Sequence, residues 1–553
     1  MPLLQPAEGR RGSPEASGLW RPGKASRGGS STFPTILPEK LSHPLDGGST
    51  VCSNNLSQHT TLDAGCTILR RMVSAANIRA RVQEQFRTGA VVASGPRVVI
   101  HSAPGRLDVL GGLAVEAGGV LAQMALPCRA AVGLQGRTDG ALQFLSRRIG
   151  PAPQQQVWLP AAEFFSSDVL PPPQSLLARL PFEQRWVAPL IALFYLLAQR
   201  GWLAGNLTGA AAPRPIGMTV VVESDIGIGA AQGASTAVLA ALLQGLARVL
   251  ALPLGTLDKA RLIAQAENIF GFSGGHAVDA LTILCAPEGP PAHLLRYRAQ
   301  PHELLGQIPL PPEVRLLALN TGVRNRRGGE IASELRLAGA MGLGIIETIY
   351  RDLGLRPDAL NGYLGNLSPE LYRRYFRSLL PRRLRGQDYL RGFGGLKSTA
   401  GTIEPKQVYR IRTAVDHLLS EHEHAENFLQ AMEELAEMPA AALAPAQRRL
   451  ILRRAGRLLL ASQHSYRLRL GLSCPQADWL INQLQRIGPD RGVYGARISG
   501  WGGGGTVVAL LDSSRAAGEA LLEIISRYPR VMAAPLQVLA AGGKGSAGAQ
   551  MAA

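Results

Sequence analysis

The sequence predicts an α+β protein of two domains, and three observations support that fold class. Its 553 residues suffice for two or three domains, and a hydrophobic share of 46% is typical of a globular chain. Apolar β-branched runs and amphipathic helical segments both occur along it. The two kinds of segment are mixed rather than strictly alternating, which favours α+β over a doubly wound parallel sheet.

Composition divides the chain into four parts. Residues 1–65 are rich in Gly, Ser and Pro and hold few large apolar side chains, which predicts a disordered N-terminal extension. Residues 66–305 are expected to form an N-terminal domain. The pattern of residues along the sequence changes near Gln300, so residues 306–542 are expected to form a C-terminal domain. Residues 543–553 are small and predict a flexible tail.

Charge and cysteine usage narrow the function classes. Lys and Arg number 58 against 40 Asp and Glu, a formal net charge of +18 that attracts anions. The arginines are spread out with no aromatic-interleaved basic motif, so we expect a phosphorylated small molecule and no nucleic acid as partner. Five scattered cysteines without a CxxC pair argue against a disulfide framework or zinc site. No signal peptide or membrane-spanning run is evident, which predicts a cytoplasmic protein without membrane contact. The oligomeric state stays open.

The N-terminal domain begins with a helical pattern over residues 67–88 and a strand or hairpin over 91–100. The segment APGRLDVLGG at 103–112 follows, and its proline and paired glycines predict a shaped turn that holds Arg106. Further expected elements are a strand at 120–134, an apolar helix at 182–201 and a helix at 257–270.

A glycine-spaced loop lies at the centre of this domain. Residues 218–222 are apolar and β-branched, and residues 234–250 are rich in Ala and Leu, so the loop joins a strand to a helix. Gly227, Gly229 and Gly233 let the backbone approach a ligand, while the free N–H groups of the first helical turn attract anions. The alternative is a plain tight turn.

The C-terminal domain is expected to open with a strand at 314–320 and to close with strand, glycine loop and strand over 495–510. Predicted helices lie between them, at 330–350, 408–432, 446–466 and 478–486. One of these helices carries three histidines and two glutamates whose spacing is not that of a zinc-binding helix, so we expect a solvated face. They are His417, Glu421, His422, Glu423 and His424.

Three glycine-containing motifs, at 103–106, 227–233 and 500–505, follow one another with Glu267 and Asp279 between the last two. This order resembles the sugar-kinase branch of the GHMP kinase superfamily, over roughly residues 90–512. The segments 103–112, 407–412 and 494–500 are similar to those of the L-arabinokinases within that branch.

The resemblance implies a two-domain GHMP-kinase-like fold with the active site between the domains. It also implies ATP-dependent phosphorylation of a sugar hydroxyl (a phosphotransferase with an alcohol acceptor, EC 2.7.1.-), with ATP and Mg²⁺ as cofactors. Arg106 matches the arginine between phosphate and sugar, Asp279 the residue that orients the hydroxyl, and Glu267 the magnesium-binding glutamate. From the residues alone, Arg106 could be a salt-bridged turn arginine, Glu267 a solvated helix residue and Asp279 a helix N-cap.

The central loop departs from the family pattern. Asp225 stands where proline is expected, and an ungapped alignment puts Ala231, Gln232 and Gly233 at the family's serine positions. A small insertion would instead put Ser235 and Thr236 there, beside the phosphates, with Ser235 as a magnesium ligand. Both registers remain open at this point.

The sugar side departs as well. Gly112 stands where galactokinases carry glutamate, Ala332 aligns with a sugar-packing tyrosine, and His276 replaces a glycine before the catalytic aspartate. The expected substrate contacts are Gly112, Glu116, His276 and Gly503. Because stripped polar partners would leave galactose hydroxyls unpaired, an altered sugar or sugar-like alcohol is expected. The alternative is a catalytically weak or inactive relative that binds a nucleotide or sugar as a regulator.

Overall fold

The described residues of this computed structural model all fall within one compact unit, Thr61–Ala553. The structure describes residues 75–87, 98–146, 155–161, 170–203, 217–270, 275–287, 292–324, 328–396, 401–438 and 444–541. The N-terminal extension and the C-terminal tail that the sequence predicts lie outside these residues.

The first sheet is built around one long strand. β2 pairs on different parts of its length with β1, β5 and β6, and β3, β4 and β7 extend the sheet in the order β4-β3-β5-β2-β6-β7. All these pairs are antiparallel except β3 with β5. The bounds are β1 Val99–Leu110, β2 Val120–Arg137, β3 Ala141–Ser146, β4 Gln155–Pro160, β5 Gly217–Ser224, β6 His293–Arg298 and β7 Glu303–Pro309. The sheet therefore runs past the domain boundary expected at residue 305.

The segment expected as a shaped turn at 103–112 is a strand over most of its length, so that prediction is wrong. β1 pairs with β2 from Val99 to Leu110, and its register shifts between Pro104 and Gly105. A bulge at this point accommodates a proline that cannot donate to the ladder. The turn itself starts only at Gly111, where φ is 105°. Arg106 consequently projects from a buried strand.

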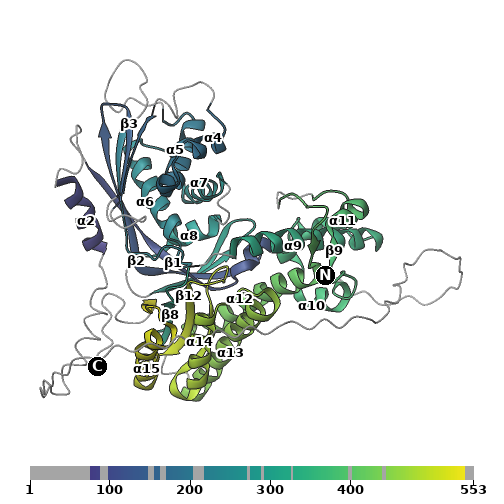
Figure 1. The fold of residues 1–553 in the computed structure, drawn as a ribbon. Coiled ribbons are helices and arrows are strands. Elements are labelled where there is room, and N and C mark those ends of the chain that lie inside the picture. Colours follow the sequence, from purple (N-terminus) through teal and green to yellow (C-terminus); the bar gives the residue numbers. More distant parts are fainter. Residues whose placement is uncertain are drawn as a thin grey trace, which may run out of the picture. The chain divides into compact units, whose positions relative to one another are not determined.

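Helices cover both faces of this sheet (Figure 1). α2 lies on one face, where Ile78 and Val82 pack with Val221. The neighbouring Val220 and Val222 point to the other face and join the main core. The helices of this first half are α2 Ala75–Arg87, α4 Pro173–Ala178, η2 Phe182–Val187, α5 Ala188–Gln199, α6 Ala234–Val249, α7 Thr256–Asn268 and α8 Ala277–Cys285.

The second half contains an antiparallel sheet in the order β11-β12-β8-β13. Its strands are β8 Val314–Asn320, β11 Val493–Ile498, β12 Thr506–Asp512 and β13 Gln537–Ala541, which confirms the strand at 314–320 and the strand–loop–strand at 495–510. A short pair, β9 Leu384–Arg385 and β10 Val408–Tyr409, lies among helices.

The helices of the second half confirm the long predicted segments. They are α9 Gly328–Asp352, η3 Pro357–Leu360, η4 Leu364–Asn366, α10 Pro369–Leu371, η5 Tyr372–Phe376, α11 Gly386–Phe393, α12 Ile411–Glu437, α13 Pro445–His464, η6 Ser465–Leu470, α14 Pro475–Ile487, η7 Pro489–Arg491 and α15 Arg515–Met532. Among the described residues, no helix has the length and apolar character needed to cross a membrane.

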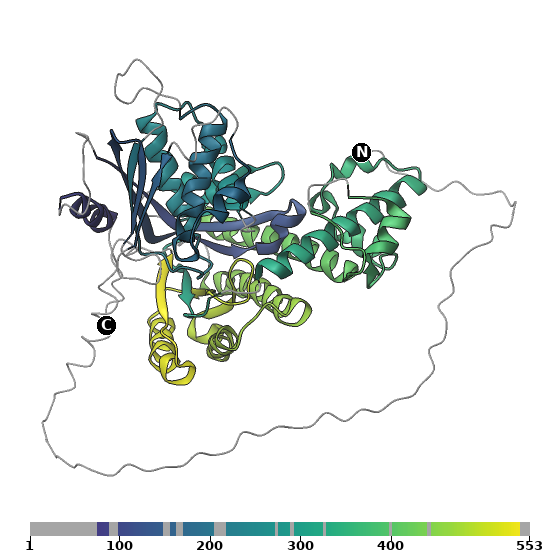
Figure 2. The same cartoon turned by 45° about the horizontal axis from the view of Figure 1, so that its top comes forward.

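The β1–β2 hairpin links the two halves. Its tip is η1, Gly112–Ala117, and Figure 2 shows this purple hairpin reaching towards the green α9. Leu113 and Ala117 of η1 belong to the same core cluster as residues of α9 and α12. The hairpin thus carries Arg106 and Glu116 from the first sheet to the helices of the second half.

Candidate active site

The glycine loop between β5 and α6 is held against strand β1. The backbone N–H of Arg106 donates to the carbonyl of Gln232 over 2.9 Å. Gly233 is the N-cap of α6 with φ of 71°, and a Cβ there would lie 2.8 Å from Cγ of Arg106. Only glycine fits this position without strain. The first-turn amides of α6 therefore open towards the loop, where an anion would be stabilised.

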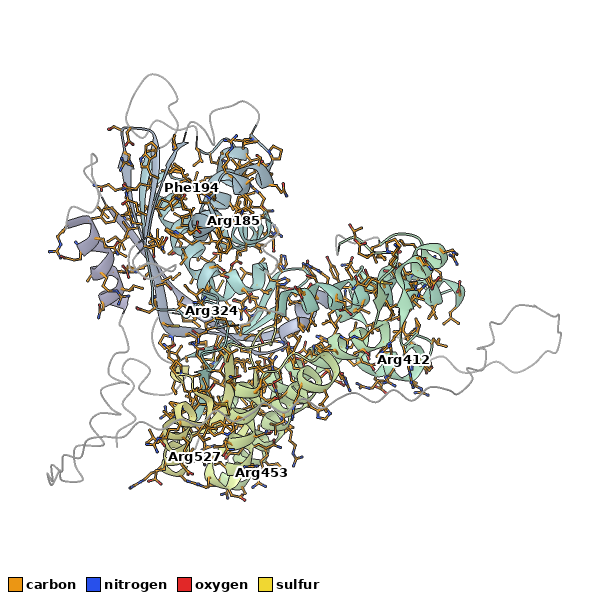
Figure 3. All side chains as sticks on the ribbon, in the orientation of Figure 1. Arg185, Phe194, Arg324, Arg412, Arg453 and Arg527 are labelled. Atoms are coloured by element: carbon orange, nitrogen blue, oxygen red, sulfur yellow. The ribbon has the colours of Figure 1, made fainter. Side chains whose placement is uncertain are left out.

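Two exposed side chains border the loop. A Cβ on Gly229 would lie 3.3 Å from Cγ of Arg324, which Figure 3 labels. Ile228 is 42% exposed within the loop itself. A cation and an apolar side chain beside a helix N-terminus match the phosphates and the base of a nucleotide. No sequence pattern singles out Arg324, since it belongs to no motif.

Two hydroxyls of the first turn of α6 lie beside Glu267. Thr236 Oγ1 donates to Glu267 Oε1 over 2.9 Å, and Ser235 Oγ donates to the same oxygen. Gln232 turns elsewhere, since its Nε2 donates to Thr506 Oγ1. Ser235 and Thr236 therefore lie beside Glu267, as the insertion register expects, whereas Gln232 faces the other glycine loop.

Glu267 is half-buried rather than fully solvated. Burial raises the pKa of Glu267, and the hydrogen bonds from Ser235 and Thr236 oppose that rise. A cation beside this carboxylate would offset its desolvation. One carboxylate and two hydroxyls are hard oxygen donors that fit Mg²⁺, which keeps several waters and leans on substrate phosphates. Consistently, the described residues contain no cluster of three His, Cys, Asp or Glu able to cage a metal.

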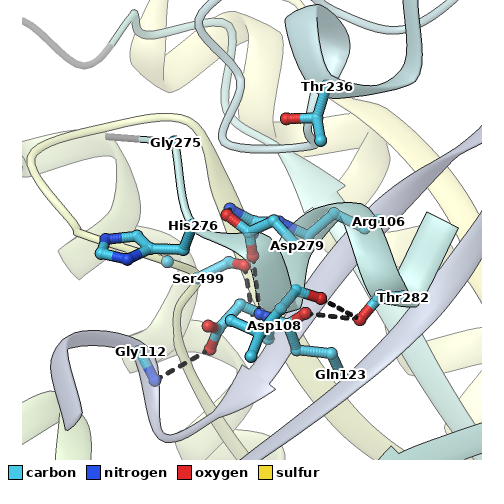
Figure 4. Close-up of polar contacts among 12 residues, drawn as sticks. Arg106, Asp108, Gly112, Gln123, Thr236, Gly275, His276, Asp279, Thr282 and Ser499 are labelled. Carbon is cyan, nitrogen blue, oxygen red and sulfur yellow. Dashed lines mark hydrogen bonds and ion pairs between the residues drawn. The ribbon is translucent and has the colours of Figure 1, made fainter. Parts of the chain in front are cut away.

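Arg106 and Asp279 form a buried ion pair, 173 positions apart along the chain. Arg106 Nη2 donates to Asp279 Oδ2 over 2.9 Å, and Gln123 Nε2 donates to Oδ1 over 2.8 Å (Figure 4). Thr282 Oγ1 in turn donates to Gln123 Oε1. The N-cap of α8 is His276, so Asp279 lies within the first turn and is not the cap. Both carboxylate oxygens are oriented, since each accepts one hydrogen bond.

Two nitrogens of Arg106 have no hydrogen-bond partner among the described residues. Its Nε and Nη1 are buried, and no hydrogen bond reaches them from the part of the chain that the structure describes. Burial by itself lowers the pKa of Arg106, but Asp279 and Asp108 outweigh burial and raise it. The guanidinium is thus charged, and its unsatisfied donors call for an anion.

A second buried ion pair contacts β1, the strand that carries Arg106. Arg497 Nη1 donates to Asp108 Oδ1 over 3.1 Å and to the carbonyl of Val109 over 3.2 Å. Its guanidinium lies 4.8 Å from the centre of the Tyr466 ring and 3.9 Å from Glu421. Arg497 is fully buried. Its contacts join the strand before the C-terminal glycine loop to the segment next to Arg106.

The helix face expected to be solvated at 417–424 is buried in part, so that prediction is wrong. His417 and Glu421 have no exposed surface. Burial lowers the pKa of His417 to about 4. Burial raises the pKa of Glu421, but His424 and Arg497 reverse this and lower it to about 2. Glu421 therefore keeps its negative charge inside the protein, because Arg497 of the distant strand β11 lies beside it.

The expected sugar-side residues fall into two groups. Glu116 Oε1 lies 3.2 Å from His276 Nε2, and the His276 ring meets Trp501 edge to face at 5.7 Å. Gly112 and Gly503 instead meet packing and hydrogen-bonding needs of the backbone. A Cβ on Gly112 would clash with the Tyr466 hydroxyl at 2.2 Å, and the N–H of Gly503 is occupied by the carbonyl of Leu472.

Comparisons with known proteins agree with this architecture. Residues 197–286 match the family described as GHMP kinases N terminal domain, and residues 443–530 match GHMP kinases C terminal. Both matches are to GHMP kinase domains, one in each half of the chain. The L-arabinokinase of Arabidopsis thaliana is 24% identical over 502 residues, covering 81% of this chain and 46% of that protein. The chain therefore spans just under half the length of this relative.

Galactokinases are also similar to this chain. The galactokinase of Mycobacterium tuberculosis strain H37Rv is 27% identical over 56% of this chain and 68% of its own length. Lactococcus lactis galactokinase, solved with galactose, aligns with a TM-score of 0.59 and 17% identity over 84% of this chain and 99% of its own. At that identity the structural match establishes the fold alone.

Sequence reasoning missed several residues of the candidate site. Gln123 is the clearest case, because a polar residue inside an apolar strand is a signal that could have found it. Arg497 lies within the segment 494–500 that carries the resemblance, although no role was expected of it. Asp108, Thr282 and Arg336 became visible only when the fold brought distant elements together.

Proposed function

We propose that the chain is an ATP-dependent kinase that phosphorylates a hydroxyl of a sugar or sugar-like alcohol. The observation that carries the proposal is the buried Arg106–Asp279 pair at 2.9 Å, beside a glycine loop whose helix N-terminus suits phosphates. Galactokinase and L-arabinokinase are relatives of the chain, which supports a sugar as the acceptor class.

Asp279 would orient the acceptor hydroxyl and take its proton. Gln123 and Arg106 hold its two oxygens, so a hydroxyl at either free lone pair meets a fixed base. The hydroxyl oxygen attacks the terminal phosphorus, the bond from that phosphorus to the bridging oxygen breaks, and the proton passes to Asp279. The free Nε and Nη1 donors of Arg106 would stabilise the charge that develops on the phosphoryl oxygens.

Ser235, Thr236 and Glu267 would hold Mg²⁺, which when bound supplies positive charge to the nucleotide phosphates. The carboxylate of Glu267 would then exchange its hydroxyl contacts for metal contacts. The amides at the start of α6 and the guanidinium of Arg324 would bind the phosphates themselves.

The test is sugar-dependent ADP formation with Mg²⁺ and ATP against a panel of pentoses, hexoses, heptoses and uronic acids. The proposal expects turnover with at least one acceptor and a phosphorylated sugar detected by mass spectrometry. Measurable ATP binding with no phosphorylated product from any acceptor would contradict catalysis. That outcome would favour a non-enzymatic relative, for which ligands stabilise the fold without phosphate transfer.

A further inference from the structure

One carboxylate faces two cationic side chains on the acceptor side of the site. Glu116 Oε1 lies 3.2 Å from His276 Nε2, and Glu116 Oε2 lies 3.7 Å from Nε of Arg336. The three residues come from η1, the N-cap of α8, and α9. Glu116 is only 4% exposed, whereas His276 and Arg336 are 18% and 35% exposed and reach open space.

This cluster borders the Arg106–Asp279 pair. The N–H of Asp279 donates to the carbonyl of His276 over 3.1 Å. The His276 ring packs edge to face on Trp501. A Cβ built on the neighbouring Gly500 would lie 3.7 Å from Arg106 Nη1. Figure 4 shows His276 and Thr236 on different sides of the ion pair, so His276 lies away from the hydroxyl proposed to hold the metal.

The cluster places two basic side chains against one carboxylate. Burial by itself lowers the pKa of His276, but the hydrogen bond and the charge of Glu116 outweigh it and raise the pKa. When His276 is protonated, Glu116 offsets one of the two positive charges and a formal excess of one remains. Nη2 of Arg336 donates to Ser333, whereas Nη1 meets no partner within the described residues.

We propose that the acceptor is an acidic sugar of the uronic acid class, whose carboxylate binds Arg336 and His276. A single negative charge matches the single excess charge, whereas a phosphate of about −2 would leave the cluster negative. Guanidinium forks bind carboxylates in a planar, bidentate manner. The inference rests on the proposed sugar kinase function.

The experiment compares matched acceptors on the full chain with Mg²⁺ and ATP. D-glucuronate and D-galacturonate are measured against D-glucose and D-galactose, and galactose 6-phosphate serves as the phosphate arm. We expect kcat/KM for a uronic acid to exceed that for its neutral partner at least tenfold. Arg336→Gln should reduce that ratio at least tenfold, mainly through KM. Arg351→Gln, on the same helix with its guanidinium on Thr348, should leave the ratio unchanged.

A second readout separates this inference from the proposed function. With a non-hydrolysable ATP analogue and Mg²⁺ present, glucuronate should raise Tm of the full chain more than glucose does, and Arg336→Gln should remove the difference. Uronate-selective stabilisation without turnover would support the acidic ligand while contradicting catalysis. Turnover that prefers neutral sugars, preference for the 6-phosphate, or selectivity unaffected by Arg336→Gln would overturn the inference and leave the kinase proposal standing.

Discussion

At the scale of single residues, the site combines groups whose charges are fixed by their neighbours. Arg106 is buried and charged, with Asp279 on one nitrogen and two donors unsatisfied. Glu267 holds its carboxylate against two hydroxyls, and its pKa is raised by burial. Each group is held in a state that binding of a phosphate or a cation would relieve. The roles of Arg106 and Glu267 can be tested separately.

Arg106→Lys should lower kcat by ~10²–10³-fold, the usual cost of losing one preorganised donor at a developing charge. Lysine keeps the positive charge but cannot bond Asp279 and a phosphoryl oxygen through a rigid fork. Steady-state ADP formation measures the effect. Arg200→Lys, on an exposed arginine that donates to Gln265, is the matched control and should retain the parent kcat. Equal kcat in both variants would remove Arg106 from the chemistry.

Glu267→Gln should raise the Mg²⁺ concentration at half-maximal activity by at least about tenfold, because an amide offers no negative charge to the cation. The measurement is a Mg²⁺ titration of ADP formation at constant ATP. Glu303→Gln changes an exposed glutamate of β7 and should leave the titration midpoint in place. An unchanged midpoint in Glu267→Gln would place the metal elsewhere.

At the scale of elements, the buried Arg497 joins three of them. It comes from β11, bonds Asp108 on β1, packs on the Tyr466 ring and lies 3.9 Å from Glu421 on α12. Helical periodicity correctly predicted α12, whereas the spacing of its histidines and glutamates led to a solvated face where Glu421 is buried. The reason is physical: an acidic residue is buried only when a cation is supplied to it. That cation lies on a distant strand, which a local pattern does not record.

Arg497→Met should destabilise the fold by about 3–5 kcal/mol, the cost of leaving buried partner charges uncompensated. Urea unfolding of the full chain at pH 7 gives the change. Arg454→Met removes an exposed arginine paired with Glu434 and should change stability by less than about 1 kcal/mol. Similar small losses in both variants would mean that Asp108 and Glu421 are neutral or hydrated.

His417 should make stability depend on pH. Burial lowers its pKa to about 4; Glu421 opposes this shift, and Arg497, Arg469 and His424 add to it. The unfolded chain therefore binds a proton near pH 6.5, whereas the folded chain does not. This contribution is full above pH 6.5 and is lost as pH falls towards 4.

His417→Gln should therefore lose about 1–2 kcal/mol less stability than the parent chain between pH 7 and pH 5. Urea unfolding at the two pH values measures the difference. His464→Gln, at an exposed histidine of α13, should behave like the parent chain. Identical pH dependence in His417→Gln and the parent would show that His417 titrates normally.

At the scale of the whole molecule, the site exists because two distant glycine loops meet. Thr506 Oγ1 donates to the carbonyl of Ala230 over 2.7 Å and accepts from Gln232, so the loop after β11 is bonded to the loop after β5. The order of the motifs predicted this meeting, as well as the α+β class and the helices around it. The bulged strand of Arg106 was not predictable, because proline and glycine usually indicate a turn.

The acceptor end shows where sequence reasoning stops. Glu116 and His276 could be expected from alignment with related motifs, but Arg336 enters only because α9 packs against η1. Gly503 matches a binding motif, yet its amide is already used by Leu472. Motif position therefore predicts which backbone lies near a ligand, whereas the free donors emerge only from the packing of the two halves.

The most direct test of the central claim, that one cleft performs phosphoryl transfer, is the kcat of Asp279→Asn with the best acceptor from the sugar panel. The account predicts a fall of ~10²–10⁴-fold, because the amide takes up no proton and no longer balances the charge of Arg106. ATP-analogue stabilisation should persist, because the glycine loop before α6 is unchanged. Asp258→Asn, at an exposed site on α7, should keep the parent rate. Undiminished sugar phosphorylation by Asp279→Asn would contradict the account.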